Sequence, residues 1–264
     1  MEQWLIFLVT GAAAGVLAGL FGVGGGLIMV PALALVLPLQ GVPERVFMQV
    51  AIGTSLAVIS ATSISSTLAH HRRGSVDWHT LQRFAPGLAL GALAGAFVAD
   101  ALTGTALQRI VGTGAILVAV QMALPRRASS APPGLRAGAI ELFGAGGVIG
   151  LLSSLVGIGG GSLSVPYLSG RGMPVHRAVG SAAAGGMPIA WAGALGFVVA
   201  GWDAQGVPAP HLGYVSLGAF VALAGTSVLC APLGVRLAHR LSAATLKRAF
   251  ALLLLAVGTR MLIA

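Results

Sequence analysis

Long apolar runs separated by short polar stretches cover the whole chain. They lie near 4–21, 26–38, 48–70, 82–99 and 107–124, and then near 138–156, 161–169, 178–200, 212–230 and 246–263. A run of about 20 residues is long enough to cross a membrane as a helix. Two runs are too short, because 26–38 as a helix reaches only about 20 Å against a core of about 30 Å, and 161–169 contains Pro166. We predict that each short run is the return arm of a re-entrant or broken helical hairpin.

The composition agrees with a membrane protein. The chain has 264 residues, of which 56% are hydrophobic and only 8% are charged. A soluble domain carries about 25% charged residues, so lipid is the expected solvent. The 40 glycines are typical of closely packed or broken membrane helices. A single cysteine, Cys230, excludes an intrachain disulfide and a cysteine-held metal site.

The chain repeats itself. Residues 11–31 read GAAAGVLAGLFGVGGGLIMVP and residues 144–166 read GAGGVIGLLSSLVGIGGGSLSVP, and the triple glycines match at an offset of 135, from Gly24 to Gly159. A Gly-Thr-Ser motif at 53–55 is matched by Gly-Ser-Ala at 180–182. We predict an N-terminal transmembrane repeat at 1–124, a linker at 125–137 and a C-terminal transmembrane repeat at 138–264. The fold class is then an all-α polytopic membrane protein, with a glycine-broken hairpin plus three spanning helices in each repeat.

Charge predicts the orientation. The formal net charge is +9, and 12 of the 15 basic residues fall in four stretches, 71–83, 125–137, 170–177 and 231–248. The positive-inside rule places these stretches, including the linker 125–137, in the cytoplasm and the termini outside. Equivalent loops of the two halves then face opposite sides, so the repeats have inverted topology, a recurrent transporter architecture. Basic residues in short loops indicate topology, and we expect no nucleic-acid partner.

The triple glycines are the candidate binding elements. Backbone N–H groups without side chains can approach an anion closely, and a broken helix offers unpaired N–H groups at the positive end of its dipole. The alternative is that the glycines serve only tight helix packing. Hydroxyl and amide groups near the breaks can add neutral donors. The predicted substrate-binding residues are Gly24, Gly25, Gly26, Gln49, Thr54, Ser55, Gly159, Gly160, Gly161, Ser162 and Ser181.

Other polar residues carry less weight. Ser153 and Ser154 precede the second triple glycine by one to two turns. The polar stretch 62–67 would line a hydrated path or a helix–helix contact. Glu141 is an acidic residue close to a predicted interface, where it can reach water. No carboxylate lies in the middle of a predicted span, so no proton or sodium site is evident.

The motifs GVGGGLIMVP, GIGGGSLSVP and AIGTS together resemble the TauE/SafE family of sulfite exporters and related anion permeases. The resemblance covers nearly the whole chain, including its two halves. It implies export or uptake of sulfur-containing anions, among them sulfite, thiosulfate and organosulfonates. In the second half, Gly180-Ser181-Ala182 departs from Gly53-Thr54-Ser55, which puts in doubt an equal contribution of hydroxyls by both halves.

We therefore expect a secondary transporter, an exporter of sulfite or organosulfonates, that works by alternating access in the bacterial inner membrane. The alternatives are an anion channel, a non-transporting membrane scaffold and a permease for a small carboxylate. The sequence lacks H-E-x-x-H, G-x-S-x-G and a P-loop, so we expect no enzyme, cofactor or metal. The expected partners are a small anion and the lipid bilayer. Proton or ion coupling and a homodimer stay open.

Overall fold

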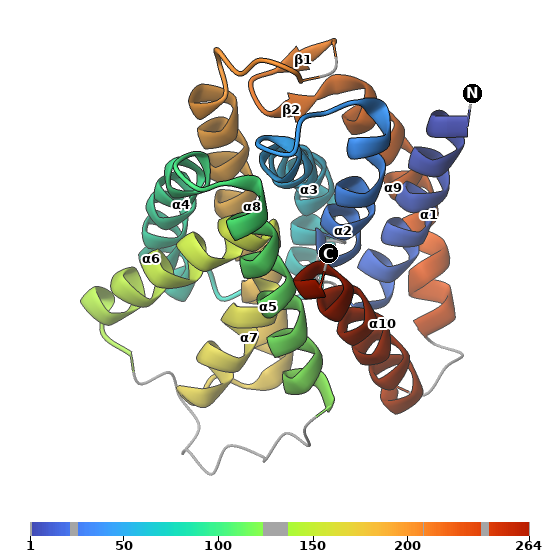
Figure 1. Ribbon diagram of the computed structural model, residues 1–264. Coiled ribbons are helices and arrows are strands. Elements are labelled where there is room, and N and C mark those ends of the chain that lie inside the picture. The colour runs from blue at the N-terminus through green and yellow to red at the C-terminus, as the bar shows by residue number, and fades with distance from the viewer. Residues whose placement is uncertain (1, 22–25, 124–136, 208, 239–242, 264) are drawn as a thin grey trace.

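A computed structural model describes residues 2–21, 26–123, 137–207, 209–238 and 243–263. Helices dominate the described residues, and one short β-hairpin joins two of them (Figure 1). The α-helices are α1 (Glu2–Phe21), α2 (Gly26–Val36), α3 (Phe47–Arg72), α4 (Trp78–Asp100), α5 (Gly104–Ala123), α6 (Ala139–Val156), α7 (Gly161–Gly170), α8 (Val175–Ala200), α9 (Leu217–Ala238) and α10 (Ala243–Ile263). A 3-10 helix covers Pro38–Gln40, and the strands are β1 (His211–Leu212) and β2 (Val215–Ser216), which pair antiparallel.

The predicted all-α membrane class is confirmed. Five of the described helices are long and apolar enough to cross a membrane, namely Phe47–Arg72, Trp78–Asp100, Gly104–Met122, Ala139–Val156 and Val175–Ala200. One predicted boundary was wrong. The apolar run 212–230 begins as part of the hairpin, and its helix starts only at Leu217. Gly213 explains the difference, because its φ of +53° makes a left-handed turn that a helix cannot contain.

The glycine-rich segment of the second half separates two helices, and residues 22–25 of the first segment lie outside the described residues. α6 ends at Gly157 and α7 begins after Gly160, and both glycines have a φ of +74°. α2 has 11 residues and α7 has 10, so each rises about 15–17 Å. That is about half of a bilayer core. Each short helix therefore reaches from one end of the bundle to about its middle.

The two halves are interleaved. α1, the first helix of the first half, packs against α9 of the second half, and α6, the first helix of the second half, packs against α4 of the first. The remaining large contacts join α3 to α8, α4 to α8 and α5 to α10. Each half therefore completes the packing of the other, and neither forms a separate compact unit.

The central helices α3 and α8 run antiparallel. A Cβ on Gly53 would lie 3.0 Å from Cβ of Phe197, and a Cβ on Gly193 would lie 2.9 Å from Cδ1 of Leu56. Further along, Trp191 donates from Nε1 to the backbone oxygen of Ser60 at 3.2 Å. These pairs run forward along α3 and backward along α8. α3 and α8 therefore pack against one another in opposite directions.

Candidate functional site

The start of α2 and the break between α6 and α7 meet inside the bundle. Gly26, at the start of α2, lies so close to Gly157, at the end of α6, that a Cβ on Gly26 would overlap the carbonyl oxygen of Gly157. The hydroxyl of Ser55 in α3 donates to the same carbonyl oxygen at 3.2 Å. All three residues are buried. Only glycine fits at position 26, so this contact depends on the residue type that the repeat places there.

The N-terminus of α7 is formed by glycine backbone alone. Gly160 caps the helix in a left-handed conformation, and no side chain caps the helix. The first turn of any helix leaves backbone N–H groups without helical partners. A Cβ on Gly160 would overlap Cδ1 of Ile189 and would lie 3.6 Å from Oγ of Ser153. The serine hydroxyl of α6 therefore lies beside the positive end of the α7 dipole.

Three buried hydroxyls around this break have no hydrogen-bond partner among the described residues. They belong to Ser153, Ser162 and Ser164, and the side chains of Ser153 and Ser164 are completely buried. A buried polar group without a partner costs about 1–3 kcal/mol and calls for an explanation in a native protein.

Several serines of α3 are paired within their own helix, as hydroxyls in membrane helices commonly are. Ser60 donates to the oxygen of Ala57 at 2.7 Å, and Ser63 donates to that of Ser60 at 3.0 Å. In the polar stretch 62–67, Thr62 and Ser65 also bond backbone three residues earlier. Three of the buried hydroxyls without a partner therefore lie at the α7 break, while the polar stretch of α3 satisfies much of its own hydrogen bonding, with Thr67 as an exception.

Thr54 and Ser181, both predicted site residues, make equivalent contacts between the halves. Thr54 Oγ1 accepts a hydrogen bond from the backbone N–H of Ser216 at 3.0 Å. Ser181 Oγ accepts one from the backbone N–H of Asp77 at 2.9 Å. In each case a hydroxyl near the start of a central helix binds the segment just before a helix of the other half. The two contacts lie near opposite ends of α3.

Gly53 and Gly180, which precede Thr54 and Ser181, also make equivalent contacts between the halves. A Cβ on Gly53 would lie 3.1 Å from the backbone oxygen of Tyr214. A Cβ on Gly180 would overlap the backbone oxygen of Ser75. The difference at the third motif position is also visible. Ser55 donates to the other half's break, whereas Ala182 has no hydroxyl to donate.

The remaining predicted residues lie as follows. Gly26, Gly159, Gly160 and Gly161 are buried at the meeting breaks, and the backbone oxygen of Gly159 packs on Gly186. Gly24 and Gly25 lie outside the described residues. Gln49 lies about one turn before Gly53 on α3, away from the breaks, where Nε2 donates to the backbone oxygens of Ala99 at 3.2 Å and Leu102 at 2.9 Å.

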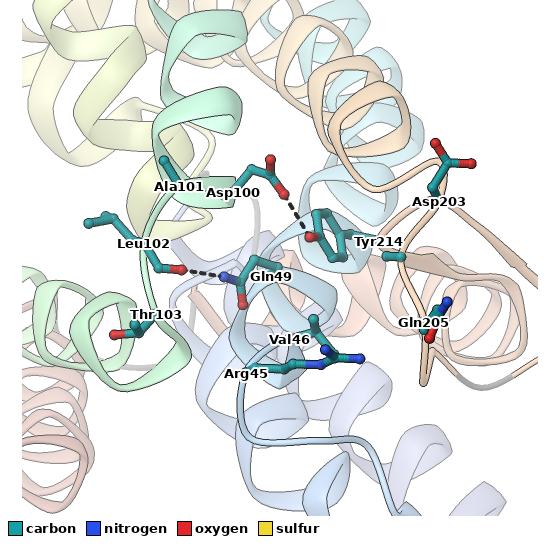
Figure 2. A pocket seen from close by; sticks show the side chains of 11 residues that line it. Arg45, Val46, Gln49, Asp100, Ala101, Leu102, Thr103, Asp203, Gln205 and Tyr214 are labelled. Atoms are coloured by element: carbon teal, nitrogen blue, oxygen red, sulfur yellow. Dashed lines mark hydrogen bonds between the residues drawn. The ribbon is translucent and has the colours of Figure 1, made fainter.

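Gln49 lines an open pocket of about 560 Å³ at one end of the bundle (Figure 2). The side chains of Asp100 and Tyr214 point toward one another there, and the Tyr214 hydroxyl donates to Oδ1 of Asp100 at 2.7 Å. Burial, and next the bond to Asp100, raise the pKa of Tyr214. The pocket is lined by Arg45, Val46, Gln49, Asp100, Ala101, Leu102, Thr103, Asp203, Ala204, Gln205 and Tyr214.

Sequence reasoning gave Ser153 little weight, noted Ser164 after the second triple glycine without placing it in the site, and passed over the Tyr214–Asp100 pair. The serines carried a usable signal, because both lie within eight residues of the second triple glycine. The pair carried none, because its partners are 114 residues apart and meet only through the interleaving of the halves.

The chain is similar to known membrane proteins along its whole length. The family model described as sulfite exporter TauE/SafE matches residues 7–261. A probable membrane transporter protein of Haemophilus influenzae is 36% identical over 257 residues, covering 97% of each chain. One of Methanocaldococcus jannaschii is 28% identical and covers 98% of this chain and 95% of its own. No solved structure matches the chain. The protein is a membrane transporter that belongs to the sulfite exporter TauE/SafE family.

Proposed function

We propose that the protein is a secondary exporter of sulfur-containing anions, such as sulfite or organosulfonates, and binds them where the two helix breaks meet. The observation that carries this proposal is the group of unpartnered hydroxyls at the N-terminus of α7. Ser153 and Ser164 are completely buried, and neither hydroxyl has a partner within the part of the chain that the structure describes. A bound oxyanion would accept their hydrogen bonds together with those of the free backbone N–H groups.

The family description supports the class of substrate. The matching family is described as a sulfite exporter, and sulfite and sulfonates present several oxygen acceptors to neutral donors of this kind. Export agrees with the electrical driving force, because a negative-inside potential favours the exit of an anion by about 2.3 kcal/mol per charge per 100 mV.

The contacts between the halves support alternating access. The Thr54–Ser216 bond and the Ser181–Asp77 bond join the halves near opposite ends of α3, whose 26 residues rise about 39 Å. The break contact between Gly26 and Gly157 lies among the central helices. Rocking of one half against the other would open one end contact while the other stays closed.

The charges support an inverted orientation in the inner membrane. Arg72 ends α3 and Arg73 follows it at one end of the bundle, whereas Arg45 precedes α3 and lines the pocket at the other. With most basic residues inside, the pocket faces out and the linker 125–137 faces the cytoplasm. Cysteines in place of the exposed residues His79 and Gln205, in a Cys230→Ser background, should react with an impermeant thiol reagent from opposite sides of the membrane. Reaction from one side would exclude the inverted orientation.

Transport and binding by serine variants test the site itself. Purified protein in proteoliposomes should show saturable sulfite flux under anaerobic conditions. Ser153→Ala and Ser164→Ala should each weaken sulfite binding by about 1–2 kcal/mol, roughly five- to thirtyfold. Because each removes an unpartnered group, neither should lower the melting temperature of the substrate-free protein.

Ser169→Ala is a matched control. Its hydroxyl is also buried without a partner, but Ser169 lies at the far end of α7, about 12 Å along the helix from Gly161, and the variant should bind normally. Loss of binding in Ser169→Ala equal to that in Ser153→Ala would refute the site. Non-saturating conductance would indicate a channel, flux only of small carboxylates would change the substrate class, and no flux of any anion would indicate a scaffold.

A further inference from the structure

We infer that the site at the α7 break selects singly charged oxyanions over doubly charged ones, so that bisulfite and monosulfonates bind while sulfate and thiosulfate do not. This inference rests on the proposed anion site and specifies its substrate class. It follows from the chemistry of the donors that the two breaks bring together, all of which are electrically neutral.

The segments that form the site contain no formal charge. Asp, Glu, Lys and Arg are absent from residues 3–43, 46–71, 142–170 and 178–202, which include α2, α7, most of α6 and α8, and α3 up to its last residue. The donors are the Ser153, Ser162 and Ser164 hydroxyls and the backbone of the first turn of α7. A helix N-terminus contributes only about half a positive charge.

The first arginine after the break does not change this balance. Arg171 follows α7, so it lies about 15 Å along the helix from Gly161. It forms an ion pair with Glu141, which cancels its charge locally. Both side chains are partly exposed, and their pair therefore lies toward the end of the bundle and not at the break.

Charge then decides selectivity. The cost of removing an ion from water rises with the square of its charge, whereas its attraction to fixed neutral donors rises only in proportion to the charge. The completely buried Ser153 and Ser164 side chains indicate that a ligand at this position loses most of its water. A second negative charge therefore adds more to the desolvation cost than these donors return. A buried Arg or Lys at the break would shift this balance toward dianions.

The singly and doubly charged forms of sulfite should bind to this site with different affinities. Sulfite changes between a singly and a doubly charged form near neutral pH, while ethanesulfonate stays singly charged and sulfate stays doubly charged. The wild-type protein in proteoliposomes can be titrated with each anion, from mildly acidic to mildly alkaline pH, with binding measured as protection against thermal unfolding and as competition for sulfite flux.

We expect ethanesulfonate to bind with the same affinity throughout and sulfate to compete at no pH. The apparent affinity for total sulfite should fall by about tenfold per pH unit above the second ionisation of sulfite, as the singly charged form is depleted. Sulfate binding comparable to that of ethanesulfonate, or sulfite affinity that rises with pH, would overturn the selectivity and leave the anion site standing. If neither sulfite nor ethanesulfonate binds, the proposed function itself fails, and the inference with it.

Discussion

Thr54 Oγ1 accepts a hydrogen bond from the backbone N–H of Ser216 at 3.0 Å, and this bond joins the two halves of the protein. At the equivalent position of the second half, Ser181 Oγ accepts from the N–H of Asp77 at 2.9 Å. Asp77 itself caps α4, since its carboxylate accepts from the N–H of Thr80 at 3.1 Å. Each of these bonds thus joins a hydroxyl of one half to the backbone of the other, and the two bonds lie near opposite ends of α3.

Removing these hydroxyls should open one end at a time. Thr54→Val leaves the N–H of Ser216 without a partner, at a cost of about 1 kcal/mol to the closed contact. A cysteine at Val46, which is 8% exposed in the pocket, should then react with an impermeant thiol reagent about fivefold faster. Ser181→Ala should have the same effect on a cysteine at the fully buried Ala178, when the reagent is added from the other side.

Each variant is the control for the other, in a background that carries Cys230→Ser. Thr54→Val should leave the cysteine at position 178 unchanged, and Ser181→Ala should leave the one at position 46 unchanged. Equal acceleration at both ends by either variant would indicate general loosening of the fold and would contradict independent end contacts.

Gly26→Ala should abolish transport. Its Cβ would overlap the carbonyl oxygen of Gly157 and would lie 2.7 Å from Cδ1 of Ile59, so the two breaks must separate. Gly144→Ala is a suitable control, because a Cβ at this helical glycine meets nothing within 4 Å, and alanine stabilises a helix by up to about 1 kcal/mol relative to glycine. Sulfite flux in proteoliposomes and the melting temperature should fall only for Gly26→Ala. Full activity of that variant would exclude a functional contact between the breaks.

The helices could be predicted closely from the sequence, because hydropathy and glycine content are local properties. The run 178–200 corresponds to α8, which covers Val175–Ala200, and the run 161–169 corresponds to α7, which covers Gly161–Gly170. The breaks followed from the repeated triple glycines for the same reason. Gly157, whose left-handed conformation ends α6, lies just outside the triple glycine and was not singled out.

The direction of each side chain could not be predicted, because it depends on how a helix is rotated against distant partners. Thr54 and Ser55 are neighbours in the sequence, yet Thr54 binds Ser216 and Ser55 binds Gly157. Gln49 shares a helix with both but reaches the pocket instead. The three side chains therefore leave α3 in different directions, which the sequence alone does not reveal.

Glu141 should prove dispensable for transport. It pairs with Arg171 and accepts a hydrogen bond from the Tyr167 hydroxyl at 3.2 Å, but its side chain is 36% exposed. Exposed ion pairs contribute about 0–1 kcal/mol. Glu141→Gln should therefore lower the melting temperature by at most a few degrees and preserve sulfite flux at every pH tested. A loss of pH dependence in this variant would instead identify Glu141 as a proton-coupling residue.

Tyr214 should make stability depend on alkaline pH. Burial, and next the bond to Asp100, raise its pKa, so the folded protein keeps the neutral phenol where an unfolded chain ionises it. The contribution of this group is therefore complete below the ordinary tyrosine pKa of about 10 and is lost as pH rises beyond that value.

Tyr214→Phe removes both the hydrogen bond and the ionisation. At neutral pH the variant should melt roughly 2–4 °C below the wild type, as expected for the loss of about 1 kcal/mol in a chain of this length. The difference should shrink as pH rises above the ordinary tyrosine pKa, because only the wild type then gains free energy by ionising on unfolding. Thermal unfolding in detergent at neutral and alkaline pH measures both values. A difference that stays constant with pH would mean that the phenol of Tyr214 ionises as readily in the folded protein as in the unfolded chain.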